Sequence, residues 1–202
     1  MKILIVFYFL FVSFCSTAQK AVLISNVTIF NGKENKTIQG HILIDGNRIS
    51  KISTTPITTN KSANTTIIDG KGRFLMPGLI DAHAHTMMDA IPMNLALMSD
   101  AGYLNLYAAQ SAEKQLMRGF TTVRDVGGAS FNLKKAIDEG LVNGPRIYPS
   151  GATISQSGGH GDFGMPTDAP RVPGQMSYLE RTGMTLIADG ADLVLMRTRE
   201  QL

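Results

Sequence analysis

From residue 75 onward, short apolar segments alternate with longer segments of helical periodicity, and this alternation limits the fold more than any other feature. Leu79–Ile80 begins the first of these strands, Phe120–Asp125 reads as the second and Arg146–Tyr148 as the third. Between the first two lies a segment with small or apolar residues at intervals of four: Leu104, Ala108, Ala112 and Leu116. Such spacing predicts a helix. Strands alternating with helices predict an α/β fold, in which crossover helices join the strands of a parallel sheet.

The turns in this region agree with the same pattern. Gly119 stands where the first long helix should stop. Ser130 is placed to cap a second helix that runs to Glu139. About three β/α units can be counted before the sequence ends.

The segment 19–74 has a different character, because its apolar runs are short and rich in β-branched residues. Val22–Ile24 and Val27–Phe30 are two such runs. His41–Ile44 and Arg48–Ile52 flank Asp45-Gly46-Asn47, a turn sequence that favours a hairpin because Gly and Asn adopt positive φ at low cost. This segment therefore predicts a small β domain separate from residues 75–202.

The first 18 residues have the layout of a secretory signal peptide. Met1-Lys2 gives a positive start, Ile3–Phe14 is an apolar run, and small residues occupy the −3 and −1 positions of a cut after Ala18. The run is shorter than the roughly 20 residues that span a bilayer. We therefore expect a secreted or periplasmic chain with no stable membrane span after cleavage. An uncleaved anchor and lipid attachment at Cys15 are the alternatives.

Composition narrows the chemistry that the chain can perform. Cys15 is the only cysteine, so the mature chain would have no disulfide, no thiolate metal site and no cysteine nucleophile. The net charge is +3, and the 19 basic residues are scattered rather than clustered. We therefore expect no nucleic-acid partner.

The motif that carries chemistry is Asp81-x-His83-x-His85, at the end of the first strand of the α/β region. Residues two apart on a strand point to the same face, with Cβ atoms roughly 7 Å apart. Two imidazoles so placed can meet on one metal ion. In β/α barrels the carboxyl ends of the strands carry the active site. An isolated His-x-His pair is weak evidence, but here it closes the longer stretch Phe74–His85.

Three segments together resemble the metal-dependent amidohydrolase superfamily. Phe74–His85 contains a Pro-Gly-x-x-Asp-x-His-x-His pattern typical of the first barrel strand, and Phe120–Gly128 is similar to the second strand. Ser155–Asp162 resembles the loop after the third strand in the branch related to imidazolonepropionase and Xaa-Pro dipeptidases. The resemblance implies a (β/α)8 TIM-type barrel that begins near residue 75 and is preceded by a small β-sandwich over residues 19–74.

The resemblance also implies an activity. A divalent metal, zinc as one or two ions, would activate water to hydrolyse an amide-type C–N bond in a small amide or dipeptide substrate. His83 and His85 would be the first two metal ligands. Asp81 would either orient these ligands or make a structural hydrogen bond at the strand end. His160 would either contact the substrate or be an exposed loop histidine.

At the end of the second strand, Arg124 and Asp125 point to opposite faces. An internal ion pair is the default interpretation for them, and a substrate contact is the alternative.

The sequence departs from the family in one respect. The family completes its metal site with a carboxylated lysine, two further histidines and an aspartate from later strands. This sequence has no histidine after His160 and no lysine after Lys135. We therefore expect residues 75–202 to be an N-terminal part of a barrel, inactive by itself. A non-catalytic secreted binding module, or a barrel completed by a second chain, are the alternatives, and the oligomeric state stays open.

Overall fold

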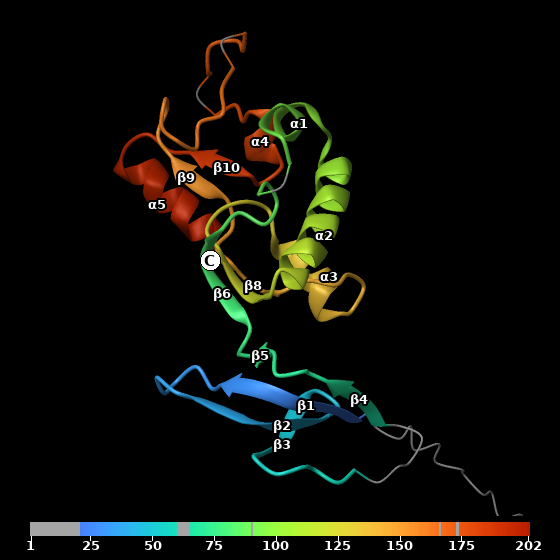
Figure 1. Ribbon diagram of the computed structural model, residues 1–202. Coiled ribbons are helices and arrows are strands. Elements are labelled where there is room, and N and C mark those ends of the chain that lie inside the picture. The colour runs from blue at the N-terminus through green and yellow to red at the C-terminus, as the bar shows by residue number, and fades with distance from the viewer. Residues whose placement is uncertain (1–20, 60–64, 90, 166, 173) are drawn as a thin grey trace, which may run out of the picture. The chain divides into compact units, whose positions relative to one another are not determined.

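The computed structural model describes residues 21–59, 65–89, 91–165, 167–172 and 174–202 (Figure 1). The chain divides into two compact units between Pro77 and Gly78. Strands make up the first unit, whereas strands and helices alternate in the second. The mixed α/β class predicted from the sequence is confirmed. The signal peptide expected at residues 1–18 lies outside the described residues.

The first unit contains a five-stranded sheet in the order β3-β2-β1-β4, with β5 also paired to β1. The neighbours of β1 pair in both senses, since β2 is antiparallel to it and β4 and β5 are parallel. The bounds of the strands are β1 (Ala21–Phe30), β2 (Thr37–Asp45), β3 (Arg48–Ser53), β4 (Thr65–Asp69) and β5 (Phe74–Leu75). The predicted hairpin is confirmed, because Asp45 pairs with Arg48 across a turn in which Gly46 has φ of 59°.

Val27, Ile29 and Ile42 form the core of the first unit, with Leu75 packed against them. Leu75 lies on β5, so the pairing of β5 with β1 joins residues 74 and 75 to this sheet. The strand-rich unit therefore extends to Pro77.

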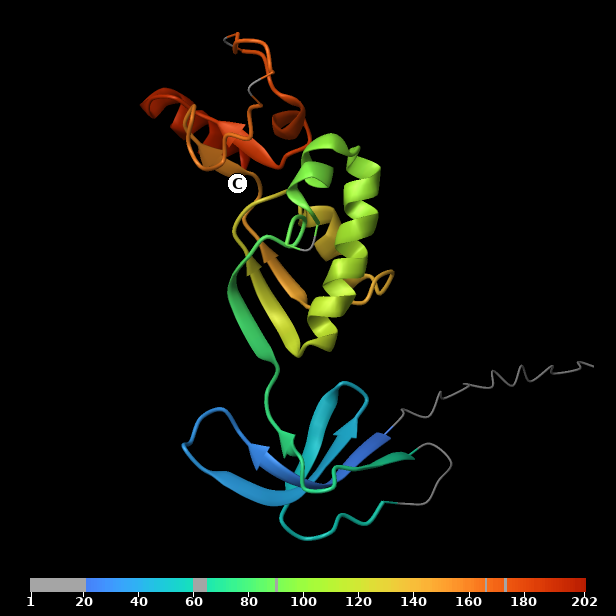
Figure 2. The same ribbon diagram turned by 45° about the horizontal axis from the view of Figure 1, so that its top comes forward.

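In the second unit, three parallel strands form a sheet in the order β6-β7-β8. Their bounds are β6 (Leu79–Ala84), β7 (Phe120–Asp125) and β8 (Arg146–Pro149). The connections contain α1 (Met93–Met98), α2 (Ala101–Met117) and α3 (Phe131–Asp138). Helices α2 and α3 lie along the same face of this sheet (Figure 2). The parallel sheet with crossover helices agrees with the strand–helix alternation of the sequence.

The chain continues from β8 through a smaller substructure. Strands β9 (Thr153–Ser155) and β10 (Thr185–Ile187) form a two-stranded parallel sheet. Helix α4 (Tyr178–Arg181) precedes β10, and α5 (Ala191–Glu200) follows it. Within the described residues, no helix is long and apolar enough to cross a membrane.

The helix-covered face of the parallel sheet holds the main core of the second unit. Val123 on β7 and Ile147 on β8 pair in register, and both are almost completely buried. Leu104, Ala108 and Ala112 of α2 are buried, as their four-residue spacing predicts. Small alanine side chains allow the helix to approach the strands closely, which matches the dense packing of protein interiors.

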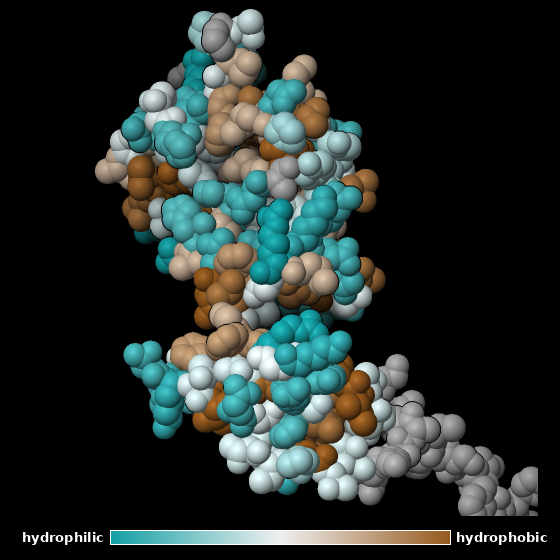
Figure 3. All heavy atoms as spheres, in the orientation of Figure 1, coloured by the Kyte–Doolittle hydropathy of each residue, from teal (hydrophilic) through white to brown (hydrophobic). Residues whose placement is uncertain are grey.

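The opposite face of the sheet is largely open. Ile80 and Tyr148 pair with the two residues that flank Val123 on β7, so both lie on the face opposite to Val123. Their exposed fractions are 69% and 56%. Apolar surface is interspersed with polar surface on the face of the molecule in Figure 3.

The prediction that the Ser130 side chain caps α3 is wrong. Ser130 does occupy the N-cap position of α3, but its side chain makes no capping hydrogen bond. Its Oγ is buried without a hydrogen-bond partner among the described residues. The backbone of Ser130 already has αR geometry rather than the β-region geometry from which a cap side chain reaches back to the helix.

We predict that Ile147→Ala lowers the free energy of unfolding by about 2–5 kcal/mol, because it leaves a cavity between the sheet and its helices. Leu141→Ala is the control: Leu141 is 76% exposed, so its change should stay within about 0.5 kcal/mol. Urea unfolding followed by circular dichroism measures both. Equal effects of the two substitutions would contradict this description of the core.

Candidate functional site

The candidate site lies at the carboxyl ends of the three parallel strands. Ala84 pairs with Asp125, and Asp125 pairs with Pro149, so these residues end their strands at one level. Hydrogen bonds continue this ladder beyond the strands, from Val126 N to the carbonyl of Ala84 (2.9 Å) and from Ser150 N to the carbonyl of Asp125 (3.0 Å). The segments after the strands are therefore held against one another where His85 and the Gly127 turn meet.

His83 and His85 lie side by side at this edge. Their ring centroids are 5.5 Å apart and their planes meet at 77°. Two imidazoles that bind one tetrahedral zinc ion through nitrogen have ring centres roughly 5 Å apart, given zinc–nitrogen bonds of about 2.0–2.1 Å. The separation of the two rings therefore matches that of two imidazole ligands of one ion, and their role as ligands stays a prediction.

A hydrogen bond fixes the ring of His85. Its Nδ1 lies 3.2 Å from the carbonyl oxygen of Gly127. Because a carbonyl can only accept, Nδ1 carries the proton in this bond and Nε2 keeps its lone pair for a metal ion. His85 is half-buried, whereas His83 is exposed.

Gly127 allows this contact because it has no side chain. A Cβ at this position would lie 2.1 Å from Thr153 Oγ1 and 3.3 Å from His85 Nδ1. Any larger residue therefore displaces Thr153 and crowds the imidazole. The glycine that the sequence places in a turn is needed here for close packing around His85.

Asp81 makes a structural contact with the backbone. Its Oδ1 accepts a hydrogen bond from the backbone N–H of His83 at 3.0 Å. The register of β6 against β7 also shifts between Asp81 and Ala84, so strict two-residue alternation does not run through the motif. Irregular pairing of this kind is common next to active sites, where it re-aims side chains.

The internal ion pair expected for Arg124 and Asp125 is not formed in the described part of the chain. Arg124 Nε donates to the carbonyl of Ala82 at 2.7 Å. Asp125 is completely buried and accepts hydrogen bonds from Thr86 and Gly127. No ion pair involves either residue within the part of the chain that the structure describes. The two side chains face opposite sides of the sheet, which separates them.

Asp89 adds a carboxylate beside the histidine pair. Its Oδ1 accepts a hydrogen bond from the backbone N–H of His85 at 3.1 Å. Desolvation raises the pKa of the Asp89 carboxyl above its ordinary value and outweighs the opposing effect of this hydrogen bond. Like the carboxyl of Asp81, it contacts the backbone of a histidine rather than an imidazole.

His160 lies on the loop after β9 and is exposed. Neighbouring residues anchor this loop. The carboxylate of Asp189 accepts from the backbone N–H and the hydroxyl of Ser157, at 2.9 and 2.6 Å. Asp162 accepts from the backbone N–H of Gly158 at 2.8 Å. The structure does not bring His160 into contact with His83 or His85, and its role stays a prediction.

Sequence reasoning missed the ion-pair network that holds the long loop. Arg171 pairs with Asp162 and, at 3.1 Å, with Glu180 of α4. Glu180 also accepts from the backbone N–H groups of Ser177 and Ile187. The Ser-x-x-Glu pattern from Ser177 is a capping-box signature, and the capping box is formed. This pattern would have predicted the start of α4.

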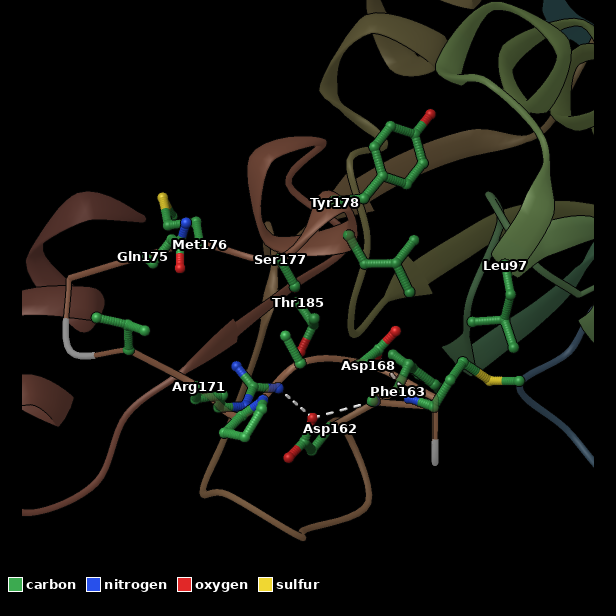
Figure 4. Close-up of a pocket in the computed structure, with 16 residues that line it drawn as sticks. Leu97, Asp162, Phe163, Asp168, Arg171, Gln175, Met176, Ser177, Tyr178 and Thr185 are labelled. Atoms are coloured by element: carbon green, nitrogen blue, oxygen red, sulfur yellow. Dashed lines mark hydrogen bonds and ion pairs between the residues drawn. The ribbon is translucent and has the colours of Figure 1, made fainter.

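A pocket of about 550 Å³ lies between this network, α4 and Leu97 of α1 (Figure 4). Its lining mixes apolar side chains such as Phe163 and Met165 with Asp162, Asp168 and Arg171. Neither His83 nor His85 lines it. We therefore place the candidate chemistry at the histidine pair rather than in this pocket.

The histidine pair does not form a complete metal site. Among the residues that the structure describes, no group of three or more His, Cys, Asp or Glu side chains could hold a metal ion. Two imidazoles alone leave at least two positions of a tetrahedral zinc ion to be filled from elsewhere.

We predict that Gly127→Ala destabilises the second unit by about 1–3 kcal/mol, because its methyl group overpacks the space between Thr153 and His85. Gly164→Ala is the matched control, since a Cβ there comes no closer than 3.3 Å to another atom. Thermal or urea unfolding of both variants tests this. A Gly127→Ala variant as stable as the control would contradict the close packing.

We predict that Glu180 contributes stability at neutral pH that is lost in acid. Burial would raise the pKa of the Glu180 carboxyl, but hydrogen bonds from Ser177 and Ile187 and the charge of Arg171 lower it below its ordinary value of 4.5. A carboxyl with a lowered pKa stabilises the folded state above 4.5, and that contribution disappears as the pH falls through the folded-state pKa.

The measurement is the difference in unfolding free energy between the wild type and Glu180→Gln as a function of pH. It should be largest and constant above about pH 5.5 and should shrink as the pH falls below 4.5. A difference that does not vary with pH would contradict the role of the ionised carboxylate.

Comparison with known proteins identifies the family. Residues 74–202 match the model of the amidohydrolase family. Ochratoxinase from Aspergillus niger is 34% identical over 138 residues, which are 63% of this chain and 28% of that protein.

Solved structures give a broader match. A prolidase complexed with N-methylphosphonate-L-proline has a TM-score of 0.74 and 32% identity, over 90% of this chain and 44% of that one. A Xaa-Pro dipeptidase with methionine bound in its active site has a TM-score of 0.67 and 29% identity, with the same coverage. The chain therefore spans less than half the length of these relatives. It belongs to the amidohydrolase family, and its structural neighbours include the Xaa-Pro dipeptidase-like members that the resemblance of Ser155–Asp162 indicates.

Proposed function

We propose that this chain supplies the first β/α units and two metal ligands of a metal-dependent hydrolase that cleaves amide-type C–N bonds. The observation that carries the proposal is the paired geometry of His83 and His85 at the carboxyl edge of a parallel sheet. Membership of the amidohydrolase family supports the same class of reaction.

The architecture proposed for the complete catalytic unit is a (β/α)8 barrel. Three parallel strands with helices on one face are the repeating element of such a barrel. The exposed apolar residues on the other face, Ile80 and Tyr148, support it, because further strands would cover that face in a closed barrel. The five-stranded unit that precedes the sheet supports the proposal of a small β-sandwich at residues 19–74.

The metal proposed is zinc, as one or two ions. When bound, zinc lowers the pKa of a water ligand and polarises the carbonyl to be attacked. In this proposal His85 binds through Nε2, because its Nδ1 is engaged by the Gly127 carbonyl. His83 supplies the second nitrogen, and Asp81 fixes the backbone N–H of His83.

The substrate proposed is a dipeptide with a C-terminal proline or a related N-acyl amino acid. The prolidase and the Xaa-Pro dipeptidase to which the structure is similar support this class. Export through residues 1–18 is part of the same proposal. His160, on an anchored loop after β9, is proposed to contact the substrate.

Two other functions would account for the incomplete ligand set. In one, a second polypeptide completes the barrel. In the other, the chain is a non-catalytic binding module. The histidine pair favours the catalytic proposals, because a binding module has no need of two imidazoles side by side at the carboxyl edge of the sheet.

The reaction class is tested with the protein expressed from its complete reading frame and loaded with zinc. The protein is incubated with a panel of Xaa-Pro dipeptides and N-acyl amino acids, and release of the free amino acid is measured. In a parallel assay for deamination, release of ammonia from adenosine derivatives is measured. We expect amino acid release that a chelator abolishes. Ammonia release without amide hydrolysis, or no zinc-dependent reaction at all, would contradict the proposal.

For the 202-residue chain itself, we predict weak zinc binding that requires both histidines and no turnover of any substrate in the panel. His83→Ala and His85→Ala should each abolish zinc binding in a dye-competition titration, because a single imidazole remains. His41→Ala is the matched control, since His41 lies on β2 in the first unit. Zinc binding that survives loss of either site histidine would show that the pair is not the metal site.

A further inference from the structure

Asp125 is a buried carboxylate whose partners are all hydrogen-bond donors. It is completely buried at the end of β7. Its Oδ2 accepts from the backbone N–H of Thr86 at 2.8 Å and from the hydroxyl of Thr86, and its Oδ1 accepts from the backbone N–H of Gly127 at 3.1 Å. A buried carboxylate is costly unless such hydrogen bonds replace water. The three hydrogen bonds offset the cost of burying the Asp125 carboxylate, and they hold Thr86 and Gly127 in fixed positions around it.

The donors to Asp125 flank His85 on two sides. Thr86 follows His85 directly in the chain, so its bonds to Asp125 fix the backbone on the carboxyl side of the histidine. Gly127 is the residue whose carbonyl oxygen lies 3.2 Å from His85 Nδ1. One carboxylate therefore ties together the strand end that carries the imidazole and the turn that orients it.

We propose that Asp125 is a positioning residue for His85: by binding Thr86 and Gly127 together, it keeps the Gly127 carbonyl against Nδ1 and leaves Nε2 free. Asp125 acts through these two neighbours, and the structure places its oxygens on them rather than on the histidine. That Nε2 then binds a metal ion rests on the proposed function. The effect of Asp125 on which nitrogen of His85 carries the proton does not depend on metal binding.

A purely structural role predicts a different result from a positioning role. If Asp125 only filled and satisfied the core, its replacement would lower stability but leave the His85 ring with its proton on Nδ1. If Asp125 positions the Gly127 carbonyl, its replacement also moves that proton, because an unconstrained neutral imidazole is free to adopt the other tautomer.

The test uses metal-free full chain labelled with ¹⁵N, with long-range ¹H–¹⁵N spectra that report which nitrogen of His85 is protonated. The test variant is Asp125→Asn, whose NH2 group must face a donor where the carboxylate offered an acceptor. Asp138→Asn is the matched control, because Asp138 is an exposed carboxylate at the end of α3. His85→Gln assigns the signal.

We expect the Nδ1–H tautomer of His85 in the wild type and in Asp138→Asn, and predominantly the Nε2–H tautomer in Asp125→Asn. A folded Asp125→Asn that keeps the Nδ1–H tautomer would overturn the proposal. Thr86→Val provides a second route if Asp125→Asn does not fold: it removes the hydroxyl donor to Asp125, and we expect the weakened link to raise the Nε2–H population of His85 in part. A folded Thr86→Val with an unchanged tautomer population would then overturn it.

Zinc titration supplies the second readout. Affinity should fall about tenfold in Asp125→Asn, as for the loss of an outer hydrogen-bond partner of a metal ligand, and about threefold in Thr86→Val, as for one lost hydrogen bond. If the wild-type chain binds no zinc, the proposed metal role fails, while the tautomer result still decides the role of Asp125. Zinc binding with equal affinity in wild type and folded Asp125→Asn would count against the positioning role.

Discussion

The site depends on one hydrogen bond, between Nδ1 of His85 and the carbonyl of Gly127. It joins the ends of two neighbouring parallel strands and sets which nitrogen of the imidazole is free. The bond forms only because Gly127 has no side chain between Thr153 and His85, and because Asp125 binds the residues on both sides. Strand register, close packing and a buried carboxylate therefore act together on one imidazole. In this account they prepare it for metal binding before any metal is present.

Much of the fold could be predicted from the sequence because its signals are local. The four-residue spacing of Leu104, Ala108 and Ala112 specifies a buried helix face, and that face is buried in the structure. The strands at Leu79–Ala84 and Phe120–Asp125 follow from apolar runs between polar turns. The hairpin at Gly46 follows from turn chemistry alone. In each case the residues that decide the structure lie within a few positions of one another.

Apart from the local cap at Ser130, the errors concern interactions that depend on residues far apart in the chain. The internal ion pair expected for Arg124 and Asp125 is not formed, because strand register places the hydrogen-bond donors of Thr86 and Gly127 against the Asp125 carboxylate. The register shift in β6 also could not be predicted from the sequence, because it depends on how β6 pairs with β7. The ion pairs of Arg171 connect positions nine residues away in both directions across a loop without regular periodicity.

The histidine motif lies between these two cases. Its spacing predicted that the imidazoles of His83 and His85 come together, and their rings do lie side by side. The spacing could not predict the irregular pairing beneath them or the carbonyl that orients His85. The sequence holds no histidine after His160 and no lysine after Lys135. The family assignment and the local geometry thus support the same chemistry at different levels of detail.

X-ray absorption spectroscopy of the zinc-loaded chain tests the central claim most directly, since it reports the ligands of the ion itself. We predict two imidazole nitrogens at about 2.0–2.1 Å, with oxygen atoms of water completing the shell. Both imidazole contributions should vanish in a His83→Ala, His85→Ala double variant. A shell made only of oxygen atoms in the wild type, or imidazole signals that persist in the double variant, would contradict it.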